Sequence, residues 1–264
     1  MKDRLLIEPA WRGLLARCGL HTARALIEHF TAGAVLKPGV WVQPCLLPSL
    51  AGGADIFYKQ YEFSPPSWSF LGRASKALRE WESYDAFAAA GVNCAQRIAA
   101  GEERDAIGRL KRAFLITLAV PGARTLTEFV AQDCPDPSKS DSRRLRHQLI
   151  MELAEMTRRI HDRGFFHNDL YWRNVLATRA GNGTPRLWWI DSPRGRHARL
   201  HQAHRRVKDL ACLDRMASEV CSRRERLAFV RAYLGEHAAA AEVKKLALAV
   251  DSYRRRRWSP RCFI

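Results

Sequence analysis

A polar loop between two strong secondary-structure signals constrains this chain most. Apolar residues recur at helical spacing from Arg143 to Arg163, which predicts a long amphipathic helix. The polar stretch 167–174 follows and leads into the apolar run Val175–Ala177. A Gly-Asn-Gly turn at 181–183 separates that run from Leu187–Ile190, so the two runs are expected to form a short hairpin. The order is therefore helix, polar loop and two-stranded hairpin.

The polar loop carries side chains that are suited to chemistry. Asp169 and Asn174 lie five positions apart on a loop held by an apolar strand, so both can face one pocket, and Asp191 follows the second strand. A carboxylate can orient the proton of an attacking hydroxyl, while Asn and a second Asp supply hard oxygen ligands for Mg²⁺. This order resembles the catalytic loop of protein kinases. The alternative is that Asp169 only caps a turn.

The preceding half of the chain offers a lysine and an acidic partner. In Ile56–Tyr61, a predicted strand, Lys59 alternates with apolar neighbours, and a helix is expected from Arg73 to Ala90. A lysine in this position can reach the α and β phosphates of a nucleotide, with a helical glutamate holding it. Glu80 and Glu82 are two positions apart and point in different directions, so only one can serve. We expect Glu80; the alternative for Lys59 is a solvated strand lysine.

The remaining pattern completes an α+β chain. We expect a helix over 8–30, strands near 40–42, 94–99 and 113–120, and a loop at Ser64–Ser67. A hairpin loop is expected at 101–105. The pair Pro121-Gly122 is expected to be a hinge.

A second set of signals follows the hinge. Thr125 and Glu128 have the spacing of a capping box, which starts a helix. The chain is predicted to be helical from Ala203 onward. These elements favour a bilobal fold with an N-lobe over residues 1–120, which has an antiparallel sheet, and a mostly helical C-lobe over residues 121–264.

Composition favours an anionic partner. The chain has 264 residues and a formal net charge of +17, which attracts nucleic acid, an anionic membrane or a phosphate-rich substrate. The start leads into no long apolar stretch, and the apolar run 113–120 is too short to span a bilayer. The seven cysteines form no Cys-x-x-Cys pair, so they are expected to be reduced thiols of a cytoplasmic protein and not metal ligands.

These motifs together resemble the lipopolysaccharide core kinases, the Kdo/WaaP-like branch of the protein-kinase-like superfamily. The resemblance is carried by stretches spread over residues 35–235, which are Tyr58–Tyr61, Arg79–Trp81, His167–Leu176, Ile190-Asp191, Lys208–Leu210 and Arg231–Leu234.

The resemblance implies phosphorylation of a heptose or Kdo hydroxyl of the lipopolysaccharide inner core, an anionic glycolipid, with ATP and Mg²⁺. At the matching positions, the resemblance implies that Asp169 is catalytic, that Asn174 and Asp191 hold Mg²⁺, and that Lys59 with Glu80 positions the phosphates. It also implies a peripheral location on the cytoplasmic face of the inner membrane. Asp209 matches the aspartate that braces the catalytic loop.

The sequence departs from the superfamily in several places. No Gly-x-Gly-x-x-Gly loop precedes Lys59, and only Gly39 and Gly52-Gly53 lie nearby. Asn168 stands where an arginine is usual, and Asp191 is followed by Ser-Pro-Arg instead of Phe-Gly. An activation-loop switch of the kind found in regulated protein kinases is therefore not expected.

Two basic stretches and two loop residues complete the candidates. Arg194–Arg206 and Arg254–Trp258 are expected to attract a membrane or a glycolipid; the alternative is a solvated helix end. Tyr171 and Arg173 can each touch substrate or phosphate, although a local salt bridge explains Arg173 equally well.

Three functions stay open. The first is the lipopolysaccharide core kinase, and the second is a kinase of this fold that acts on a protein or another small molecule. The third is a non-catalytic basic pseudokinase that binds a membrane or nucleic acid. The set of Lys59, Asp169, Asn174 and Asp191 favours an enzyme, and we expect no nucleic-acid partner.

Overall fold

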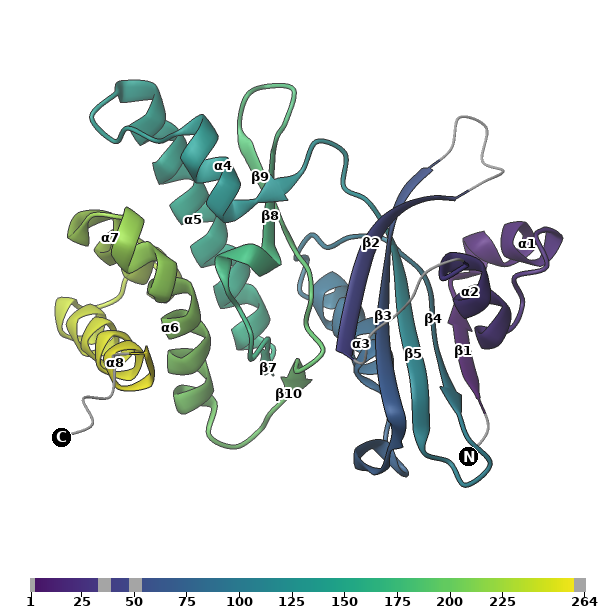
Figure 1. Cartoon of the computed structure of the whole chain (residues 1–264). Coiled ribbons are helices and arrows are strands. Elements are labelled where there is room, and N and C mark those ends of the chain that lie inside the picture. The colour runs from purple at the N-terminus through teal and green to yellow at the C-terminus, as the bar shows by residue number, and fades with distance from the viewer. Residues whose placement is uncertain (1–2, 33–38, 48–53, 259–264) are drawn as a thin grey trace, which may run out of the picture. The chain divides into compact units, whose positions relative to one another are not determined.

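The computed structural model describes residues 3–32, 39–47 and 54–258. The chain forms two compact units (Figure 1). The first comprises Met1–Asp85 and Ala95–Val120, and the second comprises Ala86–Cys94 and Pro121–Ile264. The Gly52-Gly53 pair that precedes Lys59 lies outside the described residues.

A five-stranded antiparallel sheet forms the first unit. Its strands are β1 (Arg4–Ile7), β2 (Gly39–Leu47), β3 (Ala54–Ser67), β4 (Arg97–Arg104) and β5 (Leu110–Leu118). They lie in the order β1-β4-β5-β3-β2, so β3 is hydrogen-bonded on both sides. The sheet therefore holds the backbone around Lys59 rigidly.

The N-terminal helical prediction was partly wrong. Instead of one helix over 8–30, the structure has α1 (Pro9–Arg17) and α2 (Ala23–Phe30). Gly19 between them adopts a positive φ of 72°, a backbone conformation that ends a helix and that glycine tolerates best. Thr22 then caps α2 by accepting a hydrogen bond from Ala25 N at 3.0 Å.

Helices α1 and α2 cover the sheet through one apolar cluster. Its fully buried side chains come from the helices and from three strands, and they include Leu26, Ile27, Tyr58, Ile98 and Phe114. The strand β1, which the sequence did not predict, pairs with β4 at this end of the sheet. Burial of this cluster explains why a short strand of four residues is stable here.

Two strands are longer than expected. The loop expected at Ser64–Ser67 is wrong, because β3 continues to Ser67 and pairs again with Leu110 after a register shift beyond Glu62. Such an irregularity lets prolines lie in a strand without breaking a regular ladder. The loop expected at 101–105 is also displaced, since β4 extends to Arg104. A short 3₁₀ turn, η1 (Trp68–Phe70), leads towards α3 (Lys76–Ala89).

The second unit is mostly helical. Its helices are α4 (Leu126–Asp133), α5 (Ser140–Asp162), α6 (Gln202–Val220), α7 (Arg223–Leu234) and α8 (Ala240–Trp258). Its short strands and 3₁₀ turn are β6 (Arg124–Thr125), β7 (Phe165–Phe166), η2 (Trp172–Asn174), β8 (Val175–Arg179), β9 (Pro185–Trp189) and β10 (Arg196–His197). β6, β8 and β9 form one small sheet, while β7 and β10 form another.

The local predictions in this unit are confirmed. Helix α4 begins with a capping box between Thr125 and Glu128, and α5 contains the expected amphipathic pattern with Leu145, Leu149 and Leu153 buried. β8 and β9 form the expected hairpin, in which Val175 pairs with Trp189. This hairpin and α5 frame the polar loop.

Candidate active site

Lys59 and Glu80 form a buried ion pair in the first unit. Lys59 lies on β3 and its Nζ donates a hydrogen bond to Oε2 of Glu80, on α3, at 2.9 Å. The hydroxyl of Tyr61 donates to the same oxygen at 3.1 Å. Glu82 is exposed. The structure therefore pairs Lys59 with Glu80, and Tyr61 is a second donor that we did not predict.

Asp209 of α6 braces the polar loop in the second unit. Its two carboxylate oxygens accept hydrogen bonds from the backbone N–H groups of His167 and Asn168, both at 2.8 Å. Asn168 adopts a positive φ of 62°, a conformation that asparagine tolerates better than most residues. The Asn168 amide also donates to the Phe166 and Arg194 carbonyls. The loop is thus held on several sides directly before Asp169.

A buried histidine joins this loop to the strand that precedes Asp191. His167 has no solvent exposure and stacks on Phe87 with ring centroids 6.0 Å apart. Burial lowers the pKa of His167, although the Asp209 charge opposes this shift. A neutral ring can donate from Nε2 to the carbonyl of Ile190, 3.1 Å away. His167 therefore ties the loop to the backbone next to Asp191.

Asn174 connects the same elements from the other end of the loop. Its Nδ2 donates to the backbone carbonyl of Asp169 at 2.8 Å, so Oδ1 is the side-chain atom that could bind a cation. The Asn174 carbonyl accepts a hydrogen bond from the backbone N–H of Ile190 at 3.1 Å. Asp191 follows at a positive φ of 57°. Hydrogen bonds thus link Asp169 and Asn174 to Ile190, the residue before Asp191.

This donor set fits a magnesium ion. Among residues 3–32, 39–47 and 54–258, no group of three His, Cys, Asp or Glu side chains is arranged to hold a metal. Mg²⁺ usually takes only one or two carboxylates and completes its shell with phosphate oxygens and water. An amide oxygen such as that of Asn174 and a carboxylate such as that of Asp191 are donors of the type that Mg²⁺ binds.

Tyr171 and Arg173 lie beside Asp169. The Arg173 guanidinium lies 4.5 Å from the centre of the Tyr171 ring and has one nitrogen 3.7 Å from Oδ2 of Asp169. Burial, with a smaller contribution from the nearby Cys212, raises the pKa of Tyr171 to about 12. Tyr171 therefore stays protonated and presents its ring face to cations.

The structure also brings Arg215 and Trp258 to Tyr171. Arg215 of α6 lies 6.0 Å from the Tyr171 ring and 5.5 Å from the Trp258 ring. Sequence reasoning missed this group because its members come from the loop, α6 and the end of α8, and no local spacing relates them.

The two basic stretches differ in the structure. In the first, the exposed arginines Arg194, Arg196 and Arg199 accompany Leu200, which is 74% exposed. In the second, Arg254 and Arg255 pair with Asp251 at 2.6 and 2.8 Å. The second stretch is therefore partly neutralised. No helix in the described residues combines the length and hydrophobicity that crossing a bilayer requires.

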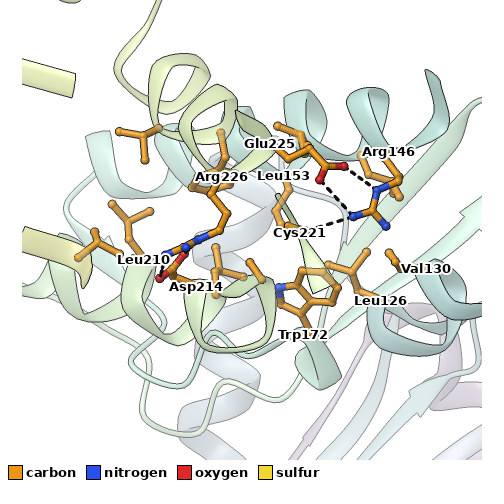
Figure 2. Close-up of a pocket in the computed structure, with 17 residues that line it drawn as sticks. Leu126, Val130, Arg146, Leu153, Trp172, Leu210, Asp214, Cys221, Glu225 and Arg226 are labelled. Carbon is orange, nitrogen blue, oxygen red and sulfur yellow. Dashed lines mark hydrogen bonds and ion pairs between the residues drawn. The ribbon is translucent and has the colours of Figure 1, made fainter. Parts of the chain in front are cut away.

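An apolar cavity of about 80 Å³ lies among the helices of the second unit (Figure 2). Leu126, Leu153 and Trp172 are among its lining residues. Two ion pairs border it, Arg146 with Glu225 and Arg226 with Asp214, each at 2.6 Å. The cavity can accept a small apolar group and offers charged groups at its edge.

Comparison with known proteins identifies the class and then the family. A solved structure described as "WaaP in complex with acyl carrier protein" matches with a TM-score of 0.63 and 21% identity, over 96% of this chain and 97% of that one. This similarity shows the fold, the expected α+β protein-kinase-like one. The antiparallel sheet, the polar loop with Asp169 and the helical second unit thus define the protein-kinase-like fold class.

The family follows from the sequence match. Residues 64–233 match the lipopolysaccharide kinase (Kdo/WaaP) family, which is more than half of the chain. The chain therefore belongs to this family, so the expected family and the kinase activity that defines it are confirmed. No curated protein sequence matches the chain.

Proposed function

We propose that this lipopolysaccharide kinase transfers the γ-phosphoryl group of ATP to a heptose or Kdo hydroxyl of the inner core, with Asp169 as the catalytic residue. One observation supports this most. Asp169 lies in a loop fastened by Asp209, His167 and Asn174, while its own side chain is 23% exposed. A carboxylate that is positioned but accessible can meet an acceptor hydroxyl.

In this proposal the other residues bind the phosphates of ATP, bind the metal ion or orient the acceptor. Lys59, held by Glu80, binds the α and β phosphates of ATP. Asn174 and Asp191 hold Mg²⁺, which offsets negative charge on the phosphoryl group. Asp169 orients the acceptor hydroxyl and accepts its proton as the new P–O bond forms and the bond to ADP breaks.

We further propose that the enzyme works at the cytoplasmic face of the inner membrane. Anionic lipids attract clustered arginines, and the segment with Arg194, Arg196 and Arg199 carries the exposed Leu200. An apolar side chain among cations suits an interface in which headgroups overlie acyl chains. The net charge of +17 points in the same direction.

An acyl carrier protein is a second proposed partner. The similar WaaP structure is described as a complex with that protein. An acyl chain needs an apolar site, and the cavity next to Leu153 and Trp172 has this character (Figure 2). Ala217→Phe, which fills the cavity, should weaken binding of an acylated carrier protein in gel filtration, and Ala228→Phe, on α7, is the control. Equal binding by both variants would reject this site.

The transfer reaction is tested with labelled ATP. Wild-type protein should label lipopolysaccharide that lacks core phosphate, and Asp169→Asn should lower the rate by about 100- to 10,000-fold. Asp141→Asn is the matched control, because Asp141 has a side chain that is 86% exposed. Transfer that survives Asp169→Asn would remove Asp169 from the mechanism.

The same assay separates the remaining alternatives. A panel of protein, aminoglycoside and small-alcohol acceptors identifies a kinase with another substrate. A pseudokinase would label none of them. Binding of nucleic acid would need no Mg²⁺ and would weaken steeply with salt.

A further inference from the structure

An aromatic and cationic cluster lies directly beside Asp169 in the second unit. Tyr171 is its centre, with Arg173 at 4.5 Å, Arg215 at 6.0 Å and the Trp258 ring at 6.1 Å. The backbone N–H of Tyr171 also donates to the Asp169 carbonyl at 2.9 Å. The helices that supply Arg215 and Trp258, α6 and α8, lie side by side (Figure 1). The cluster is therefore built by tertiary packing next to the proposed catalytic residue.

Arg215 differs from the neighbouring arginines in its partners. On α7 and α8, Arg226 and Arg254 both pair with Asp214, at 2.6 and 2.9 Å, and on α6 Arg206 pairs with Asp162 at 3.1 Å. Arg215 has no ion pair with any carboxylate in the part of the chain that the structure describes; its contacts are the Tyr171 and Trp258 rings.

This environment prepares the Arg215 guanidinium for an external anion. Aromatic rings contact the face of a guanidinium, and its N–H groups lie in the plane and remain able to bind an oxyanion with two parallel hydrogen bonds. Arg215 is exposed, so a ligand in solution can reach it. Packing against Tyr171 and Trp258 also limits the side-chain entropy that binding would cost.

We propose that Arg215 binds an oxyanion of the acceptor, a carboxylate or a phosphate, in a subsite next to Asp169. This inference rests on the proposed function, because it assigns the acceptor subsite of the same reaction. Arg215 is then a specificity-determining residue: it favours acceptors that carry a negative group and disfavours neutral or cationic ones. Tyr171 and Trp258 are positioning residues that hold it.

The test compares Arg215→Met with Arg224→Met. Methionine keeps an apolar stem against the rings but removes the cation, and Arg224 is an exposed arginine on α7 whose loss changes the net charge equally. We expect Arg215→Met to raise KM for the core acceptor about 10- to 100-fold. The kcat, the KM for ATP and the melting temperature should stay near wild type, and Arg224→Met should behave as wild type.

Modified acceptors identify the anion. One acceptor has its carboxylates converted to methyl esters, and another has its phosphates removed. The modification that deletes the recognised group should raise the KM of the wild type for the acceptor to the value that Arg215→Met shows with the unmodified acceptor. The KM of Arg215→Met should be the same for the modified and the unmodified acceptor. Equal KM values for Arg215→Met and Arg224→Met with the unmodified acceptor, or an effect on the KM for ATP instead, would overturn the proposal.

A binding measurement keeps this inference separate from the proposed reaction. The unmodified core acceptor is titrated by calorimetry into wild type, Arg215→Met and Arg224→Met without ATP. Weakened binding by Arg215→Met alone supports the subsite even if no transfer is observed, in which case only the proposed reaction fails. Equal binding by the three proteins rejects the subsite even if transfer is observed.

Discussion

The Nζ of Lys59 lies 2.9 Å from Oε2 of Glu80, and the exposed fractions of the two side chains are 12% and 2%. A pair this well buried has a desolvation cost that is offset only while both charges are present. This relationship allows a structural role of Lys59 to be separated from its proposed role in binding phosphate.

Removing Lys59 alone should destabilise the protein. Lys59→Met leaves the Glu80 carboxylate buried without its cation, and we expect a loss of about 3 kcal/mol in the free energy of unfolding, measured with urea. Lys59→Met combined with Glu80→Gln should recover most of that loss. Both proteins should nevertheless bind ATP weakly. Recovery of nucleotide binding along with stability would show that Lys59 serves the fold alone.

Replacing Asp209 should disturb the polar loop. Asp209→Ala leaves the buried N–H groups of His167 and Asn168 without acceptors, at about 1–3 kcal/mol for each. We expect a lower melting temperature and a kcat reduced more than the KM values, because Asp169 is no longer held. Asp214→Ala, on the same helix, is the comparison, and an equal fall of kcat in that variant would argue against a specific brace.

Asn174 and Asp191 should control the metal requirement. Asp191→Ala and Asn174→Ala should raise the Mg²⁺ concentration for half-maximal activity at least 10-fold, since each removes one of the two proposed oxygen ligands. Chelation of divalent ions should abolish transfer by the wild type, and addition of Mg²⁺ should restore it. An unchanged Mg²⁺ dependence in both variants would place the metal elsewhere.

The ion pair at the apolar cavity should make stability depend on pH in acid. Burial raises the pKa of Glu225, but hydrogen bonds from Arg146 and Ser222 outweigh it and hold the pKa below its usual value of 4.5. Because the pKa is lower in the folded state, the stabilisation is complete above the unfolded pKa and is lost as pH falls through the folded one.

Glu225→Gln should remove this acid dependence. The melting-temperature difference between wild type and Glu225→Gln should be largest near neutral pH and shrink below about pH 4. Glu219→Gln, an exposed position on α6, should show no such trend. A difference that stayed constant with pH would mean that the Glu225 charge does not act through this pair.

The parts predicted from sequence are those that depend on neighbouring residues. The capping box at Thr125, the amphipathic helix α5 and the β8–β9 hairpin are fixed by spacing and turn chemistry. The predicted break at Ser64–Ser67 failed, because pairing of β3 with β5 outweighed the local preference of two prolines for a loop.

Tertiary structure decided the rest. The sequence determined which side chains could take part in phosphoryl transfer, because their chemistry is fixed by residue type. It also determined most of the helices and strands that carry them, because these follow from short-range periodicity. It could not reveal that β1 would join β4, that Tyr61 would bind Glu80, or that Trp258 would hold Arg215 against Tyr171. Those contacts join distant parts of the chain, and the free energy that selects them arises only when the whole core packs.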